Sequence, residues 1–168
     1  MQRKSVLPSF INFVNTYSIL VALGSFGMFL FFSALFSVSP DCWVAAGLAL
    51  AIWIVYTLDH LLDAYRLKNT AVTKRHTFHF RHQNKIYYLL ALVGLALSYI
   101  SWHIGPAYYP IILVLGIATA LHFGINFLVS EQIKKRFFFK EVFIAFVVSL
   151  GFVGLPLAGL EPYNYPSR

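Results

Sequence analysis

Two aspartates four residues apart, Asp59 and Asp63, are the residues whose types and spacing point most directly to chemistry. They end a long apolar stretch that begins at Trp43. Four residues are about one turn of an α-helix, so both carboxylates are expected to project from the same face. Carboxylate oxygens suit Mg²⁺, and Mg²⁺ bridges phosphate oxygens. The sequence therefore predicts that Asp59 and Asp63 hold Mg²⁺ together with a diphosphate ligand.

The segment after the two aspartates is rich in cations and has no further acid; its cations are Arg66, Lys68, Lys74, Arg75, Arg81 and Lys85. Arg and Lys side chains neutralise phosphate charge. Arg66, Lys68 and Arg75 are therefore predicted to bind the diphosphate. The same residues also fit an ordinary helix end with solvated acids, followed by a basic loop that sets membrane orientation. The DxxxD pattern is too short to decide between these two interpretations.

The composition is that of a membrane protein. Of the 168 residues, 59% are hydrophobic, 18% are aromatic and only 11% are charged, and the mean hydropathy is +0.71. A soluble domain of this length would not tolerate such values. The single cysteine, Cys42, rules out an internal disulfide framework and a CxxC metal site. We predict an all-α fold, a polytopic bundle of transmembrane helices that forms one domain over residues 1–168.

About five spans are expected between the turn-forming and basic segments. They cover Phe10 or Tyr17 to Val38, Trp43 to Tyr65, Ile86 to Trp102, Ala107 to Val129, and Glu141 to Leu160. Asp41 is well placed to cap the second helix. At 1.5 Å per residue, the stretch from Trp43 to Leu62 covers about 30 Å, one hydrocarbon thickness. Asp59 and Asp63 are therefore expected at the far interface.

The distribution of Lys and Arg predicts the orientation. Two lie in the N-terminal segment, six between residues 59 and 85 and four between 130 and 140, whereas the turns at 39–41 and 103–106 have none. The N-terminus and both basic loops are therefore expected in the cytoplasm. The net charge of +7 is then mostly a topology signal and calls for no nucleic-acid partner. The expected location is the cell (inner) membrane, with the site on the cytoplasmic face.

These features resemble the N-terminal half of the UbiA family of intramembrane prenyltransferases, over about residues 15–160. Asp59 and Asp63 match the DxxxD part of that family's first motif, and the Lys-Arg-Phe stretch at 134–137 before a Gly/Pro-rich helix resembles its middle helices. The resemblance implies Mg²⁺-dependent transfer of an isoprenyl group from its diphosphate to an aromatic or other lipid-soluble acceptor. Membrane lipids would surround the protein.

The chain also departs from that family, and the departures leave its enzymatic status open. Val55 stands where the family has an asparagine, and the second aspartate-rich motif is absent from these 168 residues. A truncated or degenerate family member without activity is therefore an alternative. A homodimer is another possibility, because two copies in one orientation would present two aspartate pairs. Small residues of the first helix (Gly24, Gly27) and the fifth (Gly151, Gly154) would allow close approach of such copies.

Six histidines raise a further alternative, a membrane di-iron oxygenase. His76, His79 and His82 recur at intervals of three. Such an enzyme needs several paired histidine boxes at one membrane face. The remaining histidines, His60, His103 and His122, do not supply them, since His103 falls on the opposite side by the charge distribution.

We expect reporter fusions to reveal the orientation directly. Fusions after Lys85 and after Lys140 should report the cytoplasm, because both follow clusters of cations. A fusion after Pro106 should report the opposite side of the membrane. The reversed pattern would contradict the predicted orientation.

Overall fold

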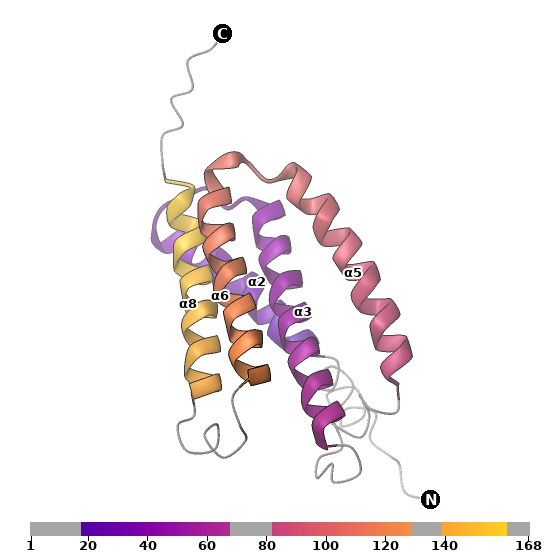
Figure 1. The fold of residues 1–168 in the computed structure, drawn as a ribbon. Coiled ribbons are helices and arrows are strands. Elements are labelled where there is room, and N and C mark those ends of the chain that lie inside the picture. The colour runs from indigo at the N-terminus through magenta and orange to yellow at the C-terminus, as the bar shows by residue number, and fades with distance from the viewer. Residues whose placement is uncertain (1–17, 68–81, 129–138, 161–168) are drawn as a thin grey trace, which may run out of the picture. The chain divides into compact units, whose positions relative to one another are not determined.

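The computed structural model of the chain describes residues 18–67, 82–128 and 139–160. Within these ranges the chain forms helices joined by turns, without a β-strand (Figure 1). The helices are α2 (Ile19–Leu35), α3 (Cys42–Leu67), α5 (Gln83–His103), the short 3₁₀ helix η2 (Pro106–Tyr108), α6 (Tyr109–Leu128) and α8 (Phe139–Ala158). The predicted all-α class is confirmed.

Three stretches of helix are long and apolar enough to cross a membrane. They are Cys42–Leu62, Gln83–His103 and Pro106–Ile125, which confirms the membrane character predicted from composition. Two further apolar helices, Ile19–Leu35 and Val142–Ala158, are shorter within the part of the chain that the structure describes. At 17 residues, Ile19–Leu35 is about 25 Å long. The first and fifth of the predicted spans therefore stay predictions.

Both ends of the turn between α2 and α3 are fixed by local hydrogen bonds. Ser37 has a left-handed backbone with φ of 57°. The N–H of Val38 donates to the carbonyl of Ser33 at 2.8 Å, and the N–H of Ser37 donates to that of Ala34 at 3.1 Å. This pair of bonds is a Schellman motif. It ends α2 at Leu35, three residues before the predicted end at Val38.

Asp41 caps α3, as its position in the sequence predicts. Its Oδ1 accepts hydrogen bonds from the N–H groups of Trp43 at 2.8 Å and Val44 at 3.2 Å. These N–H groups belong to the first turn of the helix, so no helical carbonyl four residues earlier is available to accept their hydrogen bonds. The predicted turn at Gly105 is also present, but Pro106–Tyr108 forms a 3₁₀ turn, so α6 begins at Tyr109 rather than at Ala107.

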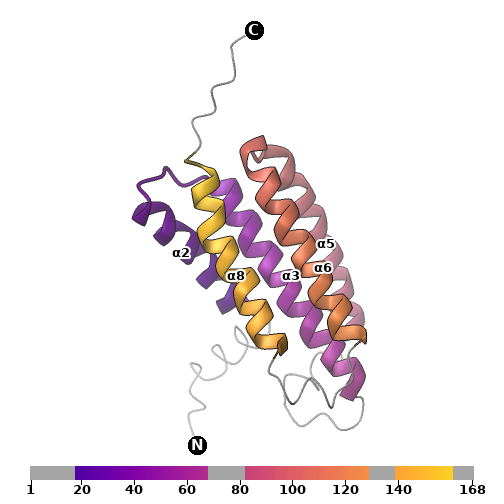
Figure 2. The ribbon, with the colours of Figure 1, turned by 60° about the vertical axis from the view of Figure 1, so that its left-hand side comes forward.

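The chain forms two compact units, one comprising Met1–Phe26 and Ala46–Trp102 and the other Gly27–Ala45 and His103–Arg168. In the second unit, α6 and α8 run in opposite directions and pack against each other (Figures 1 and 2). At Gly154 an added Cβ would lie 2.9 Å from Cδ1 and 3.1 Å from Cγ1 of Ile111. A side chain larger than hydrogen at this position would therefore displace the side chain of Ile111 at the α6–α8 contact.

In the first unit, α3 and α5 differ in how far they are enclosed. No residue of α3 from Val44 to Leu62 is exposed. In the apolar stretch of α3, 44% of the residues are buried, whereas in that of α5 only 11% are buried. The inward residues of α5 follow alternating steps of four and three, at Ile86, Leu90, Val93, Leu97 and Ile100. This narrow seam resembles coiled-coil packing and leaves the remainder of α5 exposed.

The glycines of α2 lie on an open side of the helix. Gly24 and Gly27 are exposed, and nothing in the part of the chain that the structure describes lies within 4 Å of a Cβ added at either position. The buried side of α2 carries Ser25 and Ser33, one turn before and one turn after the buried Phe29. A contact between copies through Gly24 and Gly27 stays a prediction.

Gly154→Leu should destabilise the protein, because a leucine side chain would overlap the side chain of Ile111 at the α6–α8 contact. We expect a loss of about 1–3 kcal/mol, the usual cost of overpacking, measured as a lower thermal midpoint in detergent. Gly116→Leu is the matched control: Gly116 is an exposed helical glycine of α6 with nothing within 4 Å of an added Cβ. Equal effects of the two substitutions would contradict the assigned α6–α8 contact.

Candidate site at the end of α3

The α-helix α3 runs without interruption through both predicted metal ligands. It ends at Leu67, so Asp59 and Asp63 are both helical and one turn apart on the same helix face. The side chain of Asp59 is half-buried, whereas that of Asp63 lies outside what the structure describes. The predicted helical spacing of the pair is therefore present in the backbone.

Asp59 lies within the stretch of α3, Cys42–Leu62, that is long and apolar enough to cross a membrane. It stands three positions before Leu62, which corresponds to about 4.5 Å along the helix axis. Ionisable groups inside a membrane span are costly and occur mainly where they bind ions or substrates. Asp59 is thus the more informative of the two aspartates.

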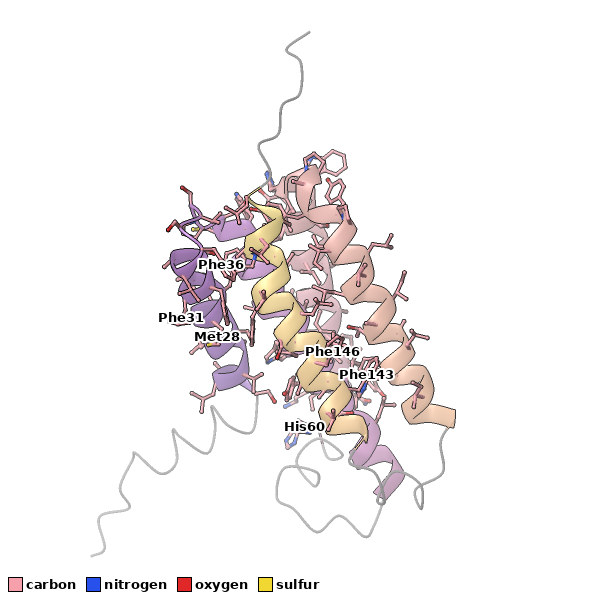
Figure 3. All side chains as sticks on the ribbon, turned by 90° about the vertical axis from the view of Figure 1, so that its left-hand side faces the viewer. Met28, Phe31, Phe36, His60, Phe143 and Phe146 are labelled. Atoms are coloured by element: carbon pink, nitrogen blue, oxygen red, sulfur yellow. The ribbon has the colours of Figure 1, made fainter. Side chains whose placement is uncertain are left out.

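Tyr56 and His60 share this part of α3 with the aspartates. Their rings meet edge to face, with centroids 6.5 Å apart and planes at 73°; Figure 3 labels His60 on α3. At 100° per residue, positions 56, 59, 60 and 63 fall within about 100° of the helix circumference. Sequence reasoning did not single out Tyr56 and His60 for this site. The sequence does contain a signal for them: Tyr56 and His60 are four residues apart, as Asp59 and Asp63 are, which places all four on neighbouring parts of the helix surface.

The predicted diphosphate-binding cations are placed only in part. Arg66 lies in the last turn of α3, and its side chain lies outside what the structure describes. Lys68 and Arg75 fall outside the described residues, as do Lys74 and Arg81, whereas Lys85 lies in the first turn of α5. Their role toward a diphosphate therefore stays a prediction from sequence.

The donor set at the end of α3 suits Mg²⁺ in chemical type. Among the described residues, no three His, Cys, Asp or Glu side chains come together as a potential metal cage. Mg²⁺ is commonly held by one or two carboxylates while substrate phosphates and water complete its shell. Two aspartates on one helix face fit this mode, in which much of the coordination comes with the substrate.

The described histidines of the second unit are packed against aromatic rings. His103 stacks on Trp43, with ring centroids 4.7 Å apart and planes at 17°. His122 of α6 is buried and stacks on Phe143 of α8, with centroids 5.9 Å apart and planes at 10°. Both contacts join segments distant in sequence, so spacing alone gave no signal for them.

These positions bear on the di-iron alternative. In the part of the chain that the structure describes, histidines do not gather into the paired boxes that such an enzyme needs. His76 and His79 lie outside the described residues, and His82 lies just before α5. The described histidines thus lend this alternative no support.

A comparison of the chain with protein-family models, curated proteins and solved structures gave no match.

Proposed function

We propose that the protein is a UbiA-like membrane prenyltransferase, or the N-terminal half of one. It transfers an isoprenyl group from a diphosphate donor to an aromatic or other lipid-soluble acceptor. The observation that carries the proposal is the unbroken course of α3 from a stretch apolar enough to cross a membrane through Asp59 to Asp63, one helical turn further on. This arrangement offers oxygen ligands where an apolar tail can remain in the membrane while a diphosphate reaches the cytoplasmic side.

The placement of the acids near the end of α3 supports a functional role. Asp63 lies one turn before Leu67, where the helix ends. The C-terminal end of a helix dipole is negative and disfavours acidic side chains, and Asp59 bears a further cost from its depth in the span. Neither aspartate occupies a capping position, unlike Asp41, which stabilises the start of the same helix. A bound cation would offset both costs.

The aspartates and the cations have different roles in the proposed reaction. Asp59 and Asp63 hold Mg²⁺, which when bound supplies positive charge to the leaving diphosphate. Arg66, Lys68 and Arg75 bind the remaining phosphate charge. The bond between the first isoprenyl carbon and the diphosphate oxygen breaks, a bond from that carbon to the acceptor forms, and the acceptor loses a proton. The apolar helices accommodate the isoprenyl chain.

A second candidate is a non-catalytic protein of the same kind, favoured by the single DxxxD pair in these 168 residues. It would bind Mg²⁺ and diphosphate without turnover. Assembly of two copies would supply a second aspartate pair and restore activity. Of the glycines predicted for such a contact, Gly151 is buried and Gly154 packs against Ile111 within the chain. A homodimer would therefore use the open glycines of α2, Gly24 and Gly27.

The direct test is binding of an isoprenyl diphosphate to the purified protein with and without Mg²⁺. Asp59→Ala should weaken Mg²⁺-dependent binding roughly ten- to a hundredfold, because it removes a charged contact worth about 1.5–3 kcal/mol. Glu161→Ala is the matched control, since it removes an acid outside the proposed site and should leave binding unchanged. Asp59→Asn keeps the size of the side chain and should fail like alanine.

Two results separate the candidates. Mg²⁺-dependent binding accompanied by transfer to an acceptor supports the enzyme, and binding without transfer supports the non-catalytic protein. Binding that ignores Mg²⁺ and tolerates changes at Asp59 and Asp63 would overturn both.

A further inference from the structure

The exposed side of α5 is apolar along most of the length of the helix. Its large exposed side chains are Tyr87, Tyr88, Leu92, Leu95, Tyr99 and Trp102. Trp102 is 87% exposed and Leu95 72% exposed, among the highest values for large apolar residues in the described part of the chain. A surface of this size needs an occupant, since exposed apolar patches mark interaction surfaces.

The order of residues along α5 matches the layers of a bilayer. Lys85 and the two tyrosines that follow it lie near the start of the helix, leucines occupy the middle, and Trp102 with His103 closes it. Tyr and Trp concentrate at the boundaries between hydrocarbon and headgroups. From Lys85 to His103 the helix rises about 27 Å, close to the thickness of one hydrocarbon core.

The polar groups on this side of α5 are satisfied by the helix itself. The hydroxyl of Ser98 donates to the carbonyl of Gly94 at 2.9 Å, and that of Ser101 donates to the carbonyl of Ser98 at 2.8 Å. Both serines are exposed. Hydroxyls at a helix–helix contact commonly bond across the contact, whereas hydroxyls facing lipid have to be satisfied within their own helix. The observed bonds meet this requirement of a lipid-facing helix.

We infer that this side of α5 is the boundary of the protein with the lipid bilayer along the full length of the helix. Acyl chains contact Leu92 and Leu95. Tyr87 and Tyr88 lie at the headgroup boundary on the side of the first basic segment, and Trp102 lies at the opposite boundary. The inference does not depend on the proposed function, and it excludes α5 from any contact between copies.

The three tryptophans of the chain allow a depth measurement. Trp102 is exposed and Trp53 of α3 is buried. Single-tryptophan variants are made by changing the other two tryptophans to phenylalanine, and a third variant carries Leu95→Trp with all three native tryptophans replaced. Each is reconstituted in phosphatidylcholine vesicles whose acyl chains carry bromine either near the headgroup or near the methyl end.

Trp102 should lose most fluorescence to the shallow bromines, and the Leu95→Trp variant should lose most to the deep ones. Trp53 should lose less than either with both lipids, which controls for quenching through the protein. If Trp102 and the Leu95→Trp variant were as protected as Trp53, the inference would be overturned, because protein would then cover α5.

A second variant keeps the test decisive if Leu95→Trp does not fold. Ser98→Leu should leave the thermal midpoint and the apparent size in detergent unchanged, because an apolar leucine side chain is favourable in contact with acyl chains. A shift to a smaller assembly, or a loss of stability comparable to that of Gly154→Leu, would instead mark this side of α5 as a protein contact.

Discussion

The rest of the structure depends on one constraint: polar groups placed in hydrocarbon have to find partners within the chain. The described helices meet it at their ends and along their sides. Asp41 accepts the first N–H groups of α3, and the Schellman bonds after Leu35 satisfy carbonyls of α2. Within the helices, Ser25 donates to the carbonyl of Val21 at 2.7 Å, and the serines of α5 do the same. These polar groups thus serve the helix that contains them, whereas the buried Oγ of Ser33 has no hydrogen-bond partner among the described residues.

Asp59 does not stabilise the start of α3 in the way that Asp41 does. It lies inside the span of α3, far from the helix start, so it caps no N–H groups. Its neighbour in the next turn, Asp63, lies near the helix end, where the dipole opposes a negative charge. A bound cation would stabilise both carboxylates. The placement of two acids one turn apart in this part of an apolar helix is the physical reason for assigning chemistry to the end of α3.

The fold could be predicted from sequence to within a few residues at most boundaries. Proline, glycine and the capping aspartate break the apolar pattern in places that the structure confirms. The end of α2 was placed too late, because a serine rather than a glycine adopts the left-handed conformation at position 37. The sequence did not show which face of each helix packs. Gly24 and Gly27 are open while Gly154 is in close contact, although all three lie in similarly apolar surroundings.

The candidate site could be predicted only where it is local. The spacing of Asp59 and Asp63 follows from one continuous helix, so a pattern of four residues was enough. Contacts between distant segments, such as those of His103 with Trp43 and of His122 with Phe143, depend on tertiary packing. The spacing of residues along the sequence therefore could not predict them. The diphosphate-binding role of Lys68 and Arg75 stays a prediction from the cluster of cations alone.

Binding of a divalent cation by Asp59 and Asp63 together with a diphosphate can be measured with Mn²⁺ as a paramagnetic substitute for Mg²⁺. Electron paramagnetic resonance of the purified protein in lipid nanodiscs measures the concentration of free Mn²⁺ as inorganic diphosphate is added. We predict that diphosphate and protein together bind more Mn²⁺ than diphosphate binds alone, and that Asp59→Asn abolishes this excess. Equal binding of Mn²⁺ by the wild-type protein and the Asp59→Asn variant would contradict a role of Asp59 as a metal ligand.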